Sequence, residues 1–137
     1  MPSLDTNCLL RLVLMDVPEQ TARVEGLLAD GRVFCVADET VLETIFVLER
    51  HAGLARPVVH DAIEALMAEA AIDIDRPLWR EVLTVYVARP KLSVTDICVA
   101  LKAARRGRAP LYTFDKKMLS QLPGCATPPA PDGTADT

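Results

Sequence analysis

Short compact apolar runs alternate along the chain with longer segments in which apolar residues recur every three or four positions. The compact runs predict strands, and they lie at 1–4, 33–37, 72–75 and 111–114. The longer segments have the spacing of amphipathic helices, and prolines and glycines mark many of their ends. They predict helices from Thr6 onward and over 18–31, 38–53, 58–71, 77–88, 93–107 and 115–122.

This alternation of strands and helices predicts an α/β fold. We expect a three-layer sandwich in which helices flank a mostly parallel central sheet of four or five strands. A fifth, edge strand would come from GCAT, residues 124–127. The last segment, 126–137, contains three prolines and no large apolar residue. We therefore expect one domain over 1–125, followed by a disordered C-terminal tail over 126–137.

The composition narrows the class of protein. Half of the 137 residues are hydrophobic and 25% are charged, as in a soluble globular domain. The net charge of −4 excludes a globally basic nucleic-acid binder but leaves room for a local basic patch. The four cysteines lie far apart, which favours reduced thiols over disulfides or zinc. No signal peptide or membrane span is recognisable, so we expect a cytoplasmic protein with no membrane partner.

Four acidic residues stand where a parallel sheet would form a site, outside the carboxyl ends of its strands. Asp5 ends the first predicted strand, and Asp115 ends the fourth. Asp96 lies in the first turn of one predicted helix, and Glu43 lies one turn into another. Four carboxylates near one sheet edge repel one another unless a cation neutralises them. An all-oxygen ligand set suits Mg²⁺ or Mn²⁺, and such an ion next to a phosphate promotes phosphodiester hydrolysis.

Each acid also has a purely structural explanation. Asp5 and Asp115 precede predicted helices, where aspartate is a preferred N-cap. Asp96 follows Ser93 by three residues, so the two can form a capping box. Glu43 can belong to a solvated helix face. The hypothesis of a metal site therefore rests on the joint placement of the four acids.

Four segments, DTNCLLR, VLETIFVL, SVTDICVALKAARRG and LYTFDKKMLSQLPG, resemble in order and spacing the motif blocks of the PIN-domain ribonucleases. Within that family the chain is similar to VapC-type toxins of bacterial toxin–antitoxin pairs. The usual final strand of the family is reduced here to CATP, which affects the sheet edge and not the acids.

The resemblance implies a metal site and several partners. The metal ligands and catalytic residues would be Asp5, Glu43, Asp96 and Asp115, with Asn7 and Thr113 as supporting polar groups. The partners would be an RNA substrate, a second copy of the chain in a homodimer, and a cognate antitoxin that covers the site. Operator DNA would be contacted only through the antitoxin.

A run of basic residues flanks two of the acids. Six lie between 102 and 117 against the single acid Asp115, and six minus one gives a local charge of +5 in a chain of net charge −4. They are candidates for holding an RNA backbone: Lys102, Arg105, Arg106, Arg108, Lys116 and Lys117. Cations at this helix end also complement its dipole, and the two roles are compatible. Arg11 is a further candidate, with pairing to an acid as the equal alternative.

The remaining distinctive side chains favour structural roles. His51 and His60 lie in helical segments away from the four acids, so we expect surface residues and no metal-independent histidine chemistry. Trp79 and Tyr86 lie seven residues apart on one helix, which favours core or dimer packing over base stacking.

These observations favour a metal-dependent endoribonuclease that acts as a toxin. One alternative is a non-catalytic PIN module that mainly binds its antitoxin and contributes to operator binding. Another is a haloacid-dehalogenase-like phosphatase, but that chemistry needs two aspartates at the first strand, where this chain has DTN.

Overall fold

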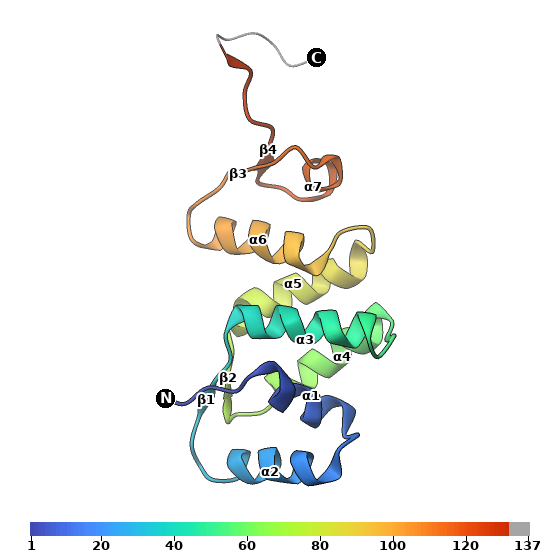
Figure 1. Cartoon of the computed structure of the whole chain (residues 1–137). Helices are drawn as coiled ribbons and strands as arrows, with labels where there is room; N and C mark the ends of the chain where they lie inside the picture. The colour runs from blue at the N-terminus through green and yellow to red at the C-terminus, as the bar shows by residue number, and fades with distance from the viewer. Residues whose placement is uncertain (132–137) are drawn as a thin grey trace. The chain divides into compact units, whose positions relative to one another are not determined.

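A computed structural model describes residues 1–131 of the chain and divides it into two compact units (Figure 1). The first unit spans Met1–Arg80 and the second spans Glu81–Thr137. The last residues of the predicted tail, 132–137, lie outside the described part, and the domain boundary at residue 125 stays a prediction. None of the described helices is long and apolar enough to cross a membrane.

The first unit contains four complete helices and a small parallel ladder. The helices are α1 (Thr6–Leu14), α2 (Pro18–Leu28), α3 (Asp38–Arg50) and α4 (Arg56–Met67). Strands β1 (Phe34–Cys35) and β2 (Ile72–Asp73) pair in parallel, with Phe34 opposite Ile72. Ser3 adds a parallel bridge to Cys35 on the other side of β1. The first unit therefore presents three parallel chain segments in the order β2, β1, Ser3.

The second unit begins within α5 (Arg76–Ala88) and continues with α6 (Val94–Arg105), β3 (Leu111–Tyr112), α7 (Lys116–Gln121) and β4 (Cys125–Ala126). Strands β3 and β4 are parallel, with Leu111 opposite Cys125. Backbone bonds extend this pairing on both sides, from Leu111 N to Gly124 O at 2.8 Å and from Thr113 N to Ala126 O at 3.0 Å. The expected short final strand is thus present as β4.

The predicted helices are confirmed, with small shifts at their ends. Helix α2 ends at Leu28 and not at Gly31, which follows in a left-handed turn at φ 85°. Helix α4 starts at Arg56, because Pro57 lies in the first turn, where its missing N–H costs nothing. The order of parallel strands and helices confirms an α/β fold.

The strands are shorter than the apolar runs predict. Within the run 1–4 only Ser3 forms a bridge, and Pro2 explains part of this because proline has no N–H to donate. The Pro2 carbonyl accepts from Cys35 N at 2.7 Å, and Leu4 N donates to Cys35 O at 3.0 Å. Asp5 then turns the chain directly into α1. This short connection leaves Asp5 at the carboxyl end of a parallel segment.

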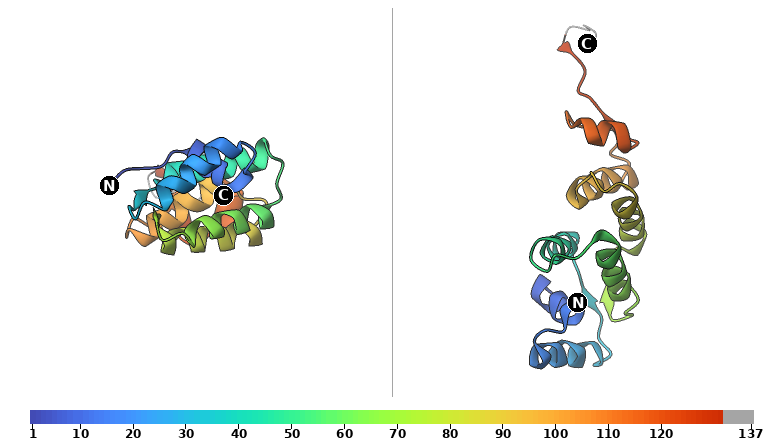
Figure 2. Two further views of the ribbon diagram at one scale, coloured as in Figure 1. Left: turned by 90° about the horizontal axis from the view of Figure 1, so that it is seen from below. Right: turned by 90° about the vertical axis from the view of Figure 1, so that its right-hand side faces the viewer.

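Aliphatic side chains form most of the buried interior, since aromatic residues make up only 4% of the chain. In the first unit α1 packs against α2 and α3 (Figure 1 and Figure 2). Trp79 and Tyr86 are fully buried, which confirms packing over base stacking. The Trp79 indole N–H donates to Asp38 Oδ1 at 2.9 Å. His51 is exposed, and His60 is half-buried beside Asp61.

Candidate metal and nucleic-acid site

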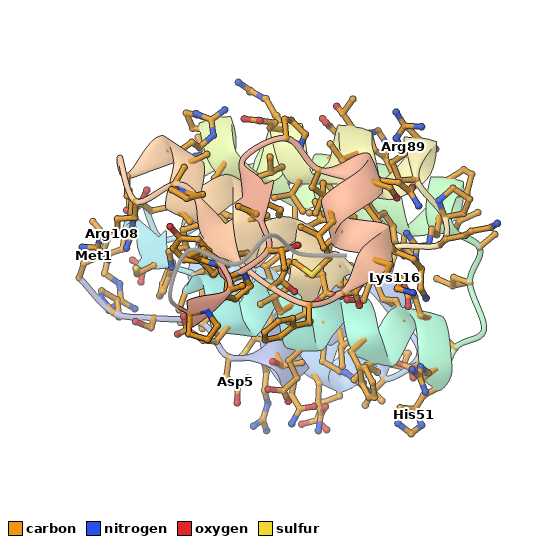
Figure 3. All side chains as sticks on the ribbon, turned by 90° about the horizontal axis from the view of Figure 1, so that it is seen from above. Met1, Asp5, His51, Arg89, Arg108 and Lys116 are labelled. Carbon is orange, nitrogen blue, oxygen red and sulfur yellow. The ribbon has the colours of Figure 1, made fainter. Side chains whose placement is uncertain are left out.

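Asp5 is the N-cap of α1. Its Oδ1 accepts a hydrogen bond from Cys8 N at 3.1 Å, and its backbone is extended at φ −93° and ψ 177°. The side chain is exposed and projects away from the ribbon (Figure 3). An ionised carboxylate has about four lone-pair sites, so the cap leaves most of them for another partner. Capping and metal binding are therefore compatible at this residue.

The thiol of Cys8 lies against the Asp5 carboxylate. Partial burial raises the pKa of this thiol, and a hydrogen bond and charge repulsion from Asp5 raise it further. The closeness of Cys8 to Asp5 was not predicted from the sequence, although a cysteine three residues after an N-cap aspartate is a signal that could have suggested it.

Asp115 has the same local arrangement in the second unit. It is the N-cap of α7, and its Oδ1 accepts from Lys117 N at 2.9 Å and from Met118 N at 3.0 Å. Asp115 N in turn donates to Thr113 Oγ1 at 3.0 Å. Thr113 therefore fixes the backbone of Asp115, and the exposed carboxylate keeps Oδ2 for another ligand.

Asp96 does not cap its own helix. Ser93 is the N-cap of α6, and its Oγ accepts from Asp96 N at 3.1 Å. Among the described residues no group donates a hydrogen bond to the half-buried Asp96 carboxylate, so only one half of the predicted capping box forms. Burial raises the pKa of Cys125, and the negative charge of Asp96 raises it further. Asp96 therefore lies near the start of β4.

Glu43 lies on the exposed side of α3. Within the described part of the chain its carboxylate has no hydrogen bond or ion pair. This placement agrees with a solvated helix face and leaves both oxygens available. Asn7, which follows Asp5 by two residues, is also exposed and has no side-chain hydrogen bond to any described residue.

The four carboxylates share one property, which is the lack of a cationic side chain as partner. Over residues 1–131 none of them forms an ion pair with lysine, arginine or histidine. Two of them belong to the first unit and two to the second. Within the described residues of either unit, no group of three or more His, Cys, Asp or Glu side chains is close enough to hold a metal ion. The available donors are all carboxylate oxygens, a set that fits Mg²⁺ or Mn²⁺ in chemistry.

The basic candidates do not share one environment. Arg11 pairs with Asp16 at 3.1 Å, which is the alternative left open for it, and Arg105 pairs with Glu81. Arg108 and Lys116 lie on opposite sides of the second unit (Figure 3). Four of these candidates have exposed side chains without a partner among the described residues: Arg106, Arg108, Lys116 and Lys117. The last two directly follow Asp115.

A comparison with models of protein families shows the family to which the chain belongs. The model of the PIN domain matches residues 3–124. The chain belongs to the PIN domain family. PIN domains have an α/β fold, are generally nucleases and typically use divalent metal ions. Neither the curated proteins nor the solved structures give a significant match.

The matched part of this PIN domain contains every candidate residue. The four acids, Asn7, Thr113 and all seven basic candidates lie within 3–124. Both units contribute to the match, since it runs through the division at residue 80. The family match therefore belongs to both units and not to one of them.

Proposed function

We propose that this PIN domain is an endoribonuclease dependent on Mg²⁺ or Mn²⁺ and the toxin of a VapC-type toxin–antitoxin pair. The observation that carries the proposal is the family match over 3–124, which includes four carboxylates without a cationic partner. The proposed fold is a three-layer sandwich in which helices flank one mostly parallel sheet of four or five strands.

In the proposed site Asp5, Asp96 and Asp115 hold the ion, and Glu43 either completes the ligand set or orients the attacking water. A bound divalent ion polarises the phosphoryl oxygen and lowers the pKa of a bound water. Each N-cap bond keeps one aspartate oxygen on the helix backbone and limits the rotation of the carboxylate. Thr113 restrains Asp115, and the Asn7 amide is available to support Asp5.

The proposed partners are an RNA substrate, a second copy of the chain and a cognate antitoxin, with operator DNA reached through the antitoxin. A cavity of about 530 Å³ between α1, α2 and α4, lined by aliphatic side chains together with Glu25 and Glu69, supports a protein partner. Leu12, Val13, Leu28 and Leu66 contribute to its lining. We expect the protein to act in the cytoplasm, together with the proposed RNA substrate and antitoxin.

The decisive experiment replaces Asp96 by asparagine. Its carboxylate has no hydrogen bond among the described residues, and the Ser93 cap bonds only to its backbone N–H, so Asp96→Asn should leave the fold intact. RNA cleavage in Mn²⁺ should fall at least about 100-fold, because the replaced group is a direct ligand and even indirect metal partners are worth about 10–100-fold. Asp61→Asn, at an exposed acid in α4, is the matched control.

Three results would count against the proposal. They are cleavage by Asp96→Asn at the wild-type rate, cleavage that survives EDTA, and growth inhibition by the Asp96→Asn variant. If the purified complex binds promoter DNA while the free protein never cleaves RNA in Mn²⁺, the chain is instead a non-catalytic module that holds its antitoxin.

A further inference from the structure

A second, smaller cavity lies in the first unit between α1 and α2, with a volume of about 260 Å³. Helix α1 contributes Asn7, Cys8 and Arg11 to its lining. Helix α2 contributes Gln20, Arg23, Val24 and Leu27. All of these residues belong to one unit, so the cavity is complete within the first 80 residues.

The size and chemistry of this cavity suit a single planar heterocycle. Pockets for drug-sized ligands measure about 300–1,000 Å³, and the observed 260 Å³ falls just below that range. Val24 and Leu27 supply aliphatic walls. The wall of the cavity is almost entirely apolar, and the amides of Asn7 and Gln20 belong to exposed side chains at its edge. They have no hydrogen-bond partner in the described structure, so they are free for the edge of a ligand. Such a combination of apolar walls and unpaired amides is what a nucleobase needs.

The arginines that line the cavity are each paired with an acid outside it, yet both can still bind a phosphate. The lining of the cavity contains two arginines and no acid. The Arg11 side chain is only 17% exposed, forms one ion pair with Asp16, and has a buried Nε without an acceptor among the described residues. Most of its five N–H donors therefore remain unused. Arg23 pairs with Glu19 on the open surface, where such pairs contribute little and rearrange easily.

The cavity begins beside a proposed metal ligand. Cys8, which lines it, donates its backbone N–H to Asp5 Oδ1 at 3.1 Å. Resting on the proposed function, we infer that the cavity is a subsite for one unpaired nucleobase of the RNA, adjacent to the phosphate that is cleaved. Arg23 and Arg11 bind the neighbouring phosphate, and the amides of Asn7 and Gln20 contact the edge of the base. The subsite selects the base at one position next to the cleaved bond.

Filling the cavity tests this inference. Gln20 is exposed and its replacement by tryptophan occupies the cavity, whereas Ala22→Trp places the same side chain on α2 outside the lining. The substrates are short single-stranded RNAs that differ in one base at each position around the cleaved bond. The wild type should prefer certain bases at one position, and Gln20→Trp should lower kcat/KM for the preferred RNA by about 5- to 100-fold, the effect expected when one base can no longer bind. Ala22→Trp should change neither the base preference nor kcat/KM.

A second measurement is independent of catalysis. RNA that carries one photoreactive base is bound in EDTA and cross-linked, and the cross-linked peptide is identified. A base placed next to the cleaved bond should cross-link within 20–27, and Arg23→Ala should weaken this cross-link without altering the melting temperature. The arginine variant also covers the case in which Gln20→Trp fails to fold.

The outcomes separate the subsite from the proposed nuclease function. The subsite alone is overturned if Gln20→Trp cleaves normally with unchanged base preference and the cross-links lie outside α1 and α2. Absence of cleavage by the wild type in Mn²⁺ overturns the nuclease, and the cross-link then still decides whether the cavity binds a base. A change of oligomeric state in Gln20→Trp, with RNA selection intact, assigns the cavity to contact between protein chains and overturns the inference.

Discussion

Asp5 is the residue at which a structural and a catalytic role can be separated by two substitutions. Its Oδ1 caps α1 through a single hydrogen bond to Cys8 N at 3.1 Å. Asparagine is as good an N-cap as aspartate but carries no charge, whereas alanine removes the cap as well. Asp5→Asn therefore tests metal binding alone, and Asp5→Ala tests metal binding together with the cap.

The magnitudes differ between the two variants. Removing an N-cap costs about 0.5–2 kcal/mol, and each kcal/mol lowers the melting temperature of a small domain by about 2–8 °C. Asp5→Ala should therefore melt a few degrees below the wild type, while Asp5→Asn should melt close to it. In both variants RNA cleavage should fall by at least about 100-fold, more than the removal of an indirect metal partner causes. Thermal unfolding followed by circular dichroism and a fluorescent RNA assay in Mn²⁺ measure the two quantities.

Two results would refute this reasoning about Asp5. If Asp5→Asn cleaves RNA at the wild-type rate, the carboxylate only caps α1 and does not bind the ion. If Asp5→Asn melts as early as Asp5→Ala, the amide does not replace the cap, and reduced cleavage no longer reports on the metal. A wild-type melting temperature combined with abolished cleavage in Asp5→Asn supports the proposed role.

Three individual interactions lead to further predictions. Reversing both charges in Lys116→Glu/Lys117→Glu should weaken RNA binding. The slope of log affinity against log salt concentration should fall by about 0.7 for each phosphate that the protein no longer neutralises. Lys91→Glu, at another exposed lysine, should leave that slope unchanged. Trp79→Phe removes the hydrogen bond to Asp38, so the free energy of unfolding in urea should fall by about 1–3 kcal/mol, and an unchanged value would contradict that bond. Because burial and the contact with Asp5 raise the pKa of Cys8, iodoacetamide should modify it more slowly than a free thiol at pH 8, and Asp5→Asn should speed the reaction as followed by mass spectrometry.

The helices could be predicted from the sequence because their signals are local. Pro18 and Pro57 lie in the first turns of α2 and α4, and Ser93 caps α6. Each of these features depends on a few adjacent residues, so a single sequence contains the necessary information. The helix ends differ from the predicted ones by only a few positions. At α2, for example, the last helical bond runs from Ala29 N to Glu25 O at 3.0 Å, and Gly31 follows two residues later in a left-handed turn.

The strands and the contacts of the site could be predicted only in part. An apolar run shows that a strand is possible, but its length depends on the backbone beside it, as Pro2 and Cys35 illustrate. Which acid an arginine meets is likewise a tertiary property. The sequence predicts that Arg11 either binds RNA or pairs with an acid. Its contact with Asp16 depends on how the chain turns after α1. The cavity between α1 and α2 arises from their packing and has no sequence motif.

The two strand-end aspartates show why a cap and a metal ligand are so easily confused. A residue between a parallel strand and the following helix has its side chain at the helix N-terminus, so one oxygen binds the backbone while the other stays available. Finding the cap therefore says nothing against the ligand role. Asp96 and Glu43 are more informative, because neither carboxylate has a hydrogen bond among the described residues. The substitution Asp96→Asn breaks no hydrogen bond of the side chain, so a drop in cleavage reports on the lost carboxylate charge. That variant, and not Asp5→Asn, should therefore decide whether this PIN domain is a metal-dependent nuclease.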